Sequence, residues 1–87
     1  MAKFQGAVVK EQGVTFAIVV VKNHVVQMQH EARKAMVEFG QFFPGMPVVL
    51  MAQNSGGRGT YFGRPDIVKF LSKFPLHAIP WKEYTVS

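Results

Sequence analysis

The segment at residues 53–66, QNSGGRGTYFGRPD, combines glycines, arginines and aromatic residues directly before a predicted helix. Glycine lets backbone amides approach an anion closely and arginine adds positive charge, so one interpretation is a phosphate-binding or ligand-binding loop. The glycine spacing matches neither GxxxxGK followed by Ser or Thr nor GxGxxG. Pro65 lacks an amide donor, and Asp66 places a carboxylate where an anion would lie. We therefore interpret the segment as a connecting loop with a recognition role.

Three residues of this loop, Arg58, Tyr61 and Arg64, are the predicted binding residues. They interleave positive charge with an aromatic ring, a combination that suits phosphates and unstacked bases. In a strand at residues 60–63, Tyr61 and Phe62 point to opposite faces, so only one of them can join a stacking surface. The chain has 10 Lys and Arg against 5 Asp and Glu, which favours acidic partners. Single-stranded nucleic acid and an acidic protein are therefore alternative predicted partners.

Residues suited to metal binding or catalysis are dispersed. His24, His30 and Glu31 are close in sequence, but the residue four positions after His30 is Lys34, so HExxH is not formed. The chain has no cysteine, which excludes thiol nucleophiles, disulfides and cysteine zinc sites. Its serines form no nucleophile elbow and its carboxylates no paired set. We expect a non-enzymatic protein with no catalytic residue, metal site or cofactor.

The periodicity of apolar residues predicts elements in the order β-β-α-β-β-α, with a further strand at the end of the chain. The predicted strands lie at residues 4–10, 14–21, 48–52, 60–63 and 79–86, and the second predicted helix at 65–74. The first predicted helix covers at least residues 30–39 of an apolar stripe at 25–43 and is stopped by Gly40 and the turn that follows. It begins either early, with Asn23 as its cap, or after an irregular connection at 22–27. The run at 14–21 is apolar on both faces, as is typical of a central strand. Pro80 restricts the last strand to the edge of the sheet.

These elements predict a single compact α+β domain over residues 1–87, with a small four- or five-stranded mixed sheet and both helices on one face. A parallel crossover and an antiparallel ferredoxin-like arrangement both fit the order of elements. The composition is 48% hydrophobic and only 17% charged, a surplus of apolar surface for so small a chain. We therefore expect a homo-oligomer, with Phe16, Ile18 and Trp81 as candidate interface residues on the uncovered face.

The segment GMPVVLMAQNSGGRGTYFGRPDIVKFL, residues 45–71, resembles the C-terminal half of thioredoxin-like domains. In that family a proline precedes a strand, a hairpin and a closing helix. The resemblance implies a cis peptide bond at Met46–Pro47. Because the chain lacks the active-site cysteine pair of the family, it implies a non-redox relative.

The sequence also predicts where the protein resides. The first residues, MAKFQGAVVK, lack the apolar core and cleavage site of a secretory signal. The longest apolar run, at residues 16–21, is far shorter than the ~20 residues that span a bilayer. Together with the lack of disulfides, these features predict a soluble cytoplasmic protein without a membrane partner.

Overall fold

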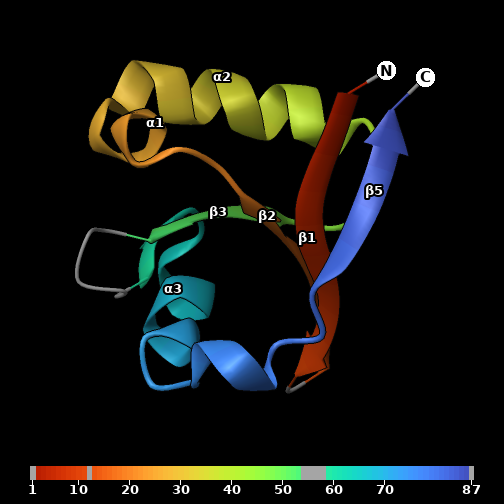
Figure 1. Ribbon diagram of the computed structural model, residues 1–87. Coiled ribbons are helices and arrows are strands. Elements are labelled where there is room, and N and C mark those ends of the chain that lie inside the picture. Colours follow the sequence, from red (N-terminus) through yellow and green to blue (C-terminus); the bar gives the residue numbers. More distant parts are fainter. Residues whose placement is uncertain (1, 12, 54–58, 87) are drawn as a thin grey trace.

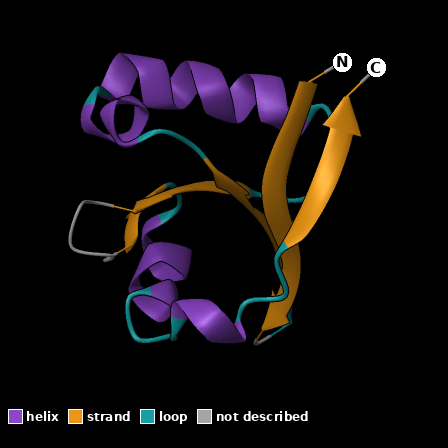
Figure 2. Ribbon diagram, in the orientation of Figure 1, coloured by secondary structure: helices purple, strands orange, loops and turns teal. Residues whose placement is uncertain are grey.

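The computed structural model of the chain describes residues 2–11, 13–53 and 59–86. Within them, one mixed sheet of five strands has the order β4-β3-β2-β1-β5 (Figures 1 and 2). The strands are β1 (Ala2–Glu11), β2 (Val14–Val20), β3 (Val48–Gln53), β4 (Gly59–Phe62) and β5 (Lys82–Val86). The helices are α1 (Asn23–Gln27), α2 (Gln29–Gly40), α3 (Pro65–Leu71) and the short 3₁₀ helix η1 (Leu76–Ala78). The predicted α+β class and order of elements are confirmed.

The first predicted helix is divided into two. Met28 has an extended backbone, with φ −108° and ψ 106°, and separates α1 from α2. Helix α2 then ends at Gly40, before the turn that contains Pro44 and Gly45. A positive φ of 80° at Gly45 suits glycine, because other residues adopt this conformation only with strain. The predicted helical segment at 30–39 therefore lies within α2, which ends at Gly40 as expected, and the break at Met28 falls in the part whose start the sequence left open.

The mixed sheet arises from two hairpins joined by a crossover. Strands β1 and β2 pair antiparallel, as do β3 and β4, whereas β2 and β3 are parallel and are connected through α1 and α2. Strand β5 returns to pair antiparallel with β1 at the edge of the sheet. Of the two predicted arrangements, the structure has the parallel crossover and not the antiparallel ferredoxin-like one. The last strand lies at the edge of the sheet, as predicted.

Helices cover both faces of the sheet, so the prediction that they share one face is wrong (Figure 1). Phe16 and Ile18 of β2 pack in one core with α3, whereas Ala17 and Val19 pack in a second core with α1 and α2. A strand with apolar side chains on both faces needs cover on both faces. The core on the α3 side buries Phe16 and Ile18, two of the residues predicted to lie in a subunit interface.

An aromatic cluster joins the edge of the sheet to α2. Phe4 of β1 stacks on Tyr84 of β5, with ring centroids 5.1 Å apart and planes at 11°. The Phe4 ring also meets Phe39 of α2 edge-on at 5.0 Å. Gly6 lies beside this cluster, and a Cβ there would be 2.8 Å from the carbonyl oxygen of Ile18. The absence of a side chain at residue 6 is therefore required for the close contact between β1 and β2.

Two further expectations concern the backbone and membrane association. The described residues contain no cis peptide bond, so Met46–Pro47 is trans. The cis bond that the thioredoxin-like resemblance implies is therefore wrong. Among the described helices, none combines the length and apolar character needed to cross a bilayer.

Candidate functional site

The structure does not bring the predicted binding residues into one site. Tyr61 packs in the α3-side core, and its buried hydroxyl has no hydrogen-bond partner among the described residues. Burial raises the pKa of Tyr61 above its ordinary value of 10.0. Arg64 lies at the surface just before α3, where its Nε is 2.9 Å from Oδ1 of Asp66. Arg58 lies outside the described residues.

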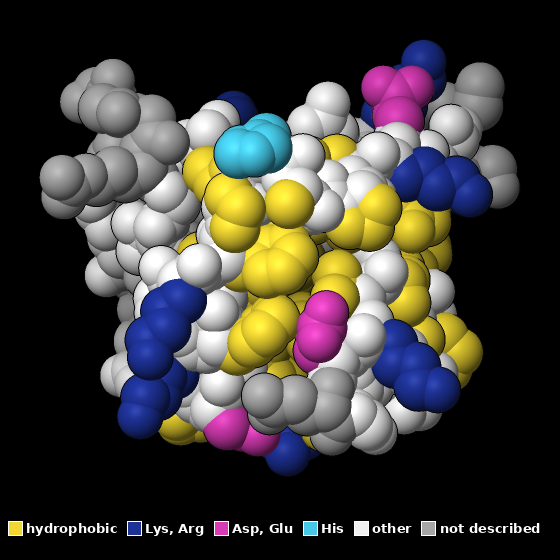
Figure 3. All heavy atoms as spheres, turned by 90° about the horizontal axis from the view of Figure 1, so that it is seen from below, with side chains coloured by type: hydrophobic (Ala, Val, Ile, Leu, Met, Phe, Trp, Pro, Cys, Tyr) yellow, Lys and Arg dark blue, Asp and Glu magenta, His cyan; other side chains and the backbone are white. Residues whose placement is uncertain are grey.

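The predicted interface residues have two different environments. Phe16 and Ile18 are 2% and 0% exposed and pack with residues of α3, so their assignment to an interface is wrong. Trp81 is partly buried, and its Nε1 donates a hydrogen bond to the carbonyl oxygen of Leu76 at 3.0 Å. Seen from below, the surface shows hydrophobic side chains gathered between separate Lys and Arg side chains (Figure 3). Only Trp81 of the three predicted residues retains surface exposure.

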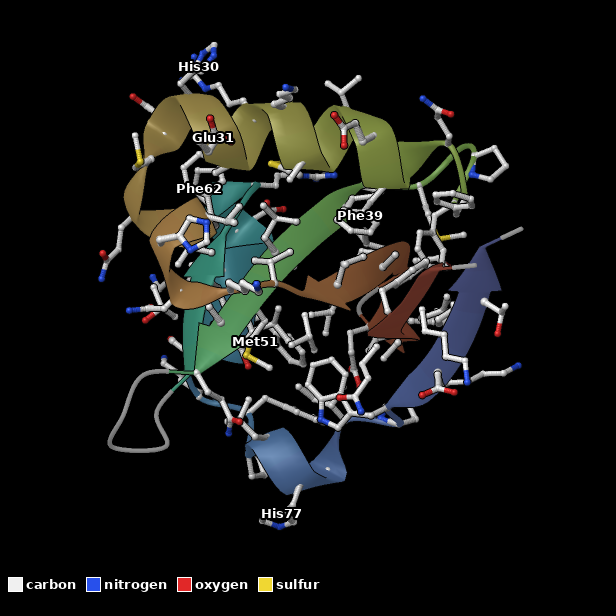
Figure 4. The ribbon with its side chains drawn as sticks, turned by 45° about the horizontal axis from the view of Figure 1, so that its top comes forward. His30, Glu31, Phe39, Met51, Phe62 and His77 are labelled. Atoms are coloured by element: carbon white, nitrogen blue, oxygen red, sulfur yellow. The ribbon has the colours of Figure 1, made fainter. Side chains whose placement is uncertain are left out.

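The histidines do not converge. His30 and Glu31 lie on the outer side of α2, whereas His77 lies on η1 at the opposite side of the molecule (Figure 4). In the described part of the chain, no group of three or more His, Cys, Asp or Glu side chains is arranged to hold a metal ion.

A groove of about 560 Å³ opens where β1 separates from β2. Pairing between these strands stops at Gly6 opposite Val19, and residues 2–5 of β1 pair only with β5. The chain beyond β2 instead follows β3, since the amide of Val21 donates to the carbonyl oxygen of Met51 at 2.8 Å. The first part of β1 therefore has a strand neighbour on one side only. The space on its other side forms the β1–α2 groove.

The lining of the β1–α2 groove is mainly apolar. Phe39 points from α2 toward the sheet (Figure 4) and forms one wall together with Phe4. Partly buried apolar side chains from β1, β2, the β2–α1 connection and both helices line the groove: Phe4, Val20, Val21, Val25, Ala35 and Phe39. Because none of them is fully buried, each retains apolar surface that a ligand can cover.

Charged side chains lie at the rim. Lys3 and Glu83 form an exposed ion pair, with Nζ 3.6 Å from Oε1. Lys22, on the other side of the groove, is exposed and forms no ion pair with any described residue. The rim therefore carries two positive charges and one negative charge, of which only the Lys22 charge is uncompensated.

This arrangement suits binding of a small apolar group. Ligand sites are typically hollows of ~300–1,000 Å³ with apolar walls and a few polar groups that orient the ligand. Sequence reasoning missed the groove, because its position depends on where two strands stop pairing. The local signal that bears on it is Gly6, whose lack of a side chain permits close pairing at the last position before the strands separate.

No protein-family model matches the chain, and no curated protein or solved structure matches it either.

Proposed function

We propose that the chain is a small non-enzymatic binding module whose recognition site is the β1–α2 groove. The observation that carries this proposal is the separation of β1 from β2, which leaves partly exposed apolar side chains around a hollow of about 560 Å³. Covering such side chains with an apolar ligand is favourable by about 25 cal/mol per Å² of surface removed from water. The groove is therefore suited to a ligand with an apolar body.

A neutral alkyl probe tests this proposal directly. We expect 1-octanol, added to ¹⁵N-labelled protein, to shift the amide resonances of Val21, Val25 and Phe39 and to leave those of α3 unchanged. An octyl chain contributes roughly 0.8 kcal/mol per buried methylene, from which the cost of association is subtracted, so weak binding in fast exchange is expected. Titration by two-dimensional NMR measures such binding residue by residue.

A matched pair of variants on α2 links the binding to the groove. Ala35 lines the groove, whereas Val37 on the same helix is 73% exposed. Ala35→Phe fills the hollow and is expected to abolish the octanol-dependent shifts, while Val37→Phe adds a ring toward solvent and retains them. Circular dichroism verifies that both variants fold. Octanol shifts spread evenly over the surface, or equal binding by both folded variants, would contradict a binding role for the groove.

We also propose that the module self-associates through the edge of the sheet formed by β1 and β5, where Phe4 contacts Phe42 and Tyr84. Phe42 is 46% exposed and its ring lies 5.7 Å from that of Phe4. Val8 is 41% exposed and lies on the same face of β1 as Phe4, because alternate residues of a strand share a face. Light scattering is expected to detect a dimer that Val8→Lys dissociates and Val37→Lys does not. A monomer at high protein concentration would contradict self-association.

Single-stranded nucleic acid remains the alternative partner predicted from the basic and aromatic residues. Its binding releases counterions, so the affinity is expected to fall steeply as salt rises. Titration of labelled single-stranded DNA and RNA at low and high salt tests this alternative. Tight, salt-sensitive binding by a monomer would favour it over the apolar groove.

A further inference from the structure

We infer that the β1–α2 groove binds a free amphipathic anion, such as an alkyl or aryl carboxylate, with its apolar body inside the groove and its anionic end beside Lys22. This inference rests on the proposed function of the groove and adds the chemical class of the ligand. It follows from the position of the charges relative to the apolar lining.

The lining determines where an anionic group can lie. Phe39, Val25 and Ala35 offer no hydrogen-bond donor from their side chains, and burying an unpaired carboxylate among them costs several kcal/mol. The anionic end must therefore remain at the rim, where water and lysine side chains are available. A ligand with one apolar and one anionic end fits this division of the groove.

Lys22 is the rim group that is free to pair with the anion. Its side chain is exposed, forms no ion pair with any described residue and follows Val20 and Val21, which line the groove at the end of β2. Lys3 is already paired with Glu83 at 3.6 Å. Glu83 has a second effect, because its carboxylate lies on the rim and repels an incoming anion. The two lysines are therefore expected to contribute unequally, with Lys22 dominant.

This unequal arrangement predicts opposite effects for two rim substitutions. Lys22→Met keeps a long apolar stem but removes the charge, and is expected to weaken octanoate binding about twofold to fivefold, the range of an exposed ion pair. Glu83→Gln releases Lys3 and removes the repulsion, and is expected to strengthen octanoate binding by a similar factor. Neither substitution is expected to change the affinity for 1-octanol, which has the same chain length and no charge.

The experiment compares octanoate and 1-octanol by NMR titration of the groove amides in the wild type and in each variant. Lys69→Met on α3, at the opposite face of the sheet, is the matched control, because it changes the net charge by the same amount far from the groove. We expect this control to leave octanoate binding unchanged at ~0.1 M salt, where screening acts over about 10 Å. The effect of Lys22→Met on octanoate is expected to shrink at about 1 M salt.

Two results separate this inference from the proposed function. If 1-octanol binds in the groove but octanoate does not, or if Lys22→Met and Lys69→Met affect octanoate equally, the anionic ligand class is refuted and the apolar binding site stands. If neither probe shifts the groove amides, both proposals fail. Weaker octanoate binding in Lys22→Met together with stronger binding in Glu83→Gln supports the inference, because a merely structural role of these exposed residues would affect both probes alike.

Discussion

Replacing Gly6 with alanine is expected to destabilise the protein, because the new methyl group has no space. The added Cβ would lie 2.8 Å from the carbonyl oxygen of Ile18, and the nearest atoms of the Tyr84 and Phe4 rings would lie at 3.4 and 3.6 Å. The rings are at ordinary contact distance, whereas the oxygen lies closer than 3.0 Å, a separation at which the backbone must shift to admit a Cβ atom. That oxygen belongs to the backbone of the buried strand β2, so it cannot rotate away.

The expected magnitude follows from two opposing effects. Insertion of an extra carbon into a tightly packed site costs typically ~1–3 kcal/mol. Alanine in place of glycine also reduces the entropy of the unfolded chain, which returns about 0.4–1 kcal/mol. A net loss of ~1–2 kcal/mol in the free energy of unfolding is therefore expected. For a domain of this size, this corresponds to a decrease in Tm of about 5–15 °C.

Gly40→Ala is the matched control for this substitution. Gly40 ends α2, and a Cβ there would meet no atom within 4 Å. Because alanine has the higher helix propensity, this variant is expected to gain about 0.5–1 kcal/mol. Thermal unfolding followed by circular dichroism, together with urea titration, measures both variants. A Tm of Gly6→Ala equal to or above that of the wild type would refute the argument that the β1–β2 contact excludes a side chain at residue 6.

Three further substitutions test the packing and electrostatics of the α3 side. Tyr61→Phe removes a buried hydroxyl without a partner, so the free energy of unfolding is expected to stay within ~1 kcal/mol of the wild type or to rise. Burial raises the pKa of Tyr61 in the folded protein above 10.0, so the Tyr61 hydroxyl of the unfolded chain loses its proton at a lower pH. The free energy of unfolding of the wild type therefore decreases as the pH rises above about 10. The urea midpoint is expected to fall less over this pH range in Tyr61→Phe. Leu71 is 1% exposed, so Leu71→Ala is expected to lower the free energy of unfolding in urea by ~2–5 kcal/mol. The control Val37→Ala, at the surface, is expected to lower it by less than about 0.5 kcal/mol. Similar losses in the two variants would contradict the assignment of Leu71 to the core. Arg64→Ala breaks an exposed ion pair with Asp66 and is expected to cost less than ~1 kcal/mol, a difference that about 1 M salt should remove; a larger, salt-independent loss would show that Arg64 has another structural role.

The sequence was sufficient to predict the order of elements and the interior strands. The runs at 16–21 and 48–52 are apolar at successive positions, and the corresponding strands β2 and β3 lie inside the sheet. The last strand lies at the edge of the sheet, as predicted, although it begins at Lys82 and Pro80 precedes it. An apolar run depends only on neighbouring residues, so it can be recognised from the sequence alone.

The distribution of helices was mispredicted because the apolar surplus was assigned to an interface instead of a second core. Phe16 and Ile18 alternate with Ala17 and Val19 along β2, and both sets are buried, each on its own face. This alternation of apolar with apolar residues already implies cover on both faces. Composition alone does not distinguish a subunit interface from a second layer of helices.

The β1–α2 groove was beyond sequence reasoning for a different reason. Its existence depends on the end of β1–β2 pairing at Gly6 and on the return of β5 to the first residues of β1. Both depend on pairing between residues that are far apart in the sequence. Neither alters the spacing of apolar residues along a strand, which is the pattern that the sequence displays. Lys22 and Glu83, which both line the groove, are far apart in the sequence and belong to no motif.

The pairing of β5 with β1 also has a kinetic consequence. Lys3 lies opposite Thr85, so this ladder closes a loop that contains nearly the whole chain, whereas each hairpin closes a short one. Contacts between distant residues are formed late in folding, after their closure entropy has been offset by local structure. We therefore expect native-state hydrogen exchange to show β5 and residues 2–5 of β1 opening at a lower free energy than β2 and β3. Because the same residues of β1 form a wall of the groove, a ligand bound there should slow exchange along β5, and its occupancy can be followed at a strand it need not touch.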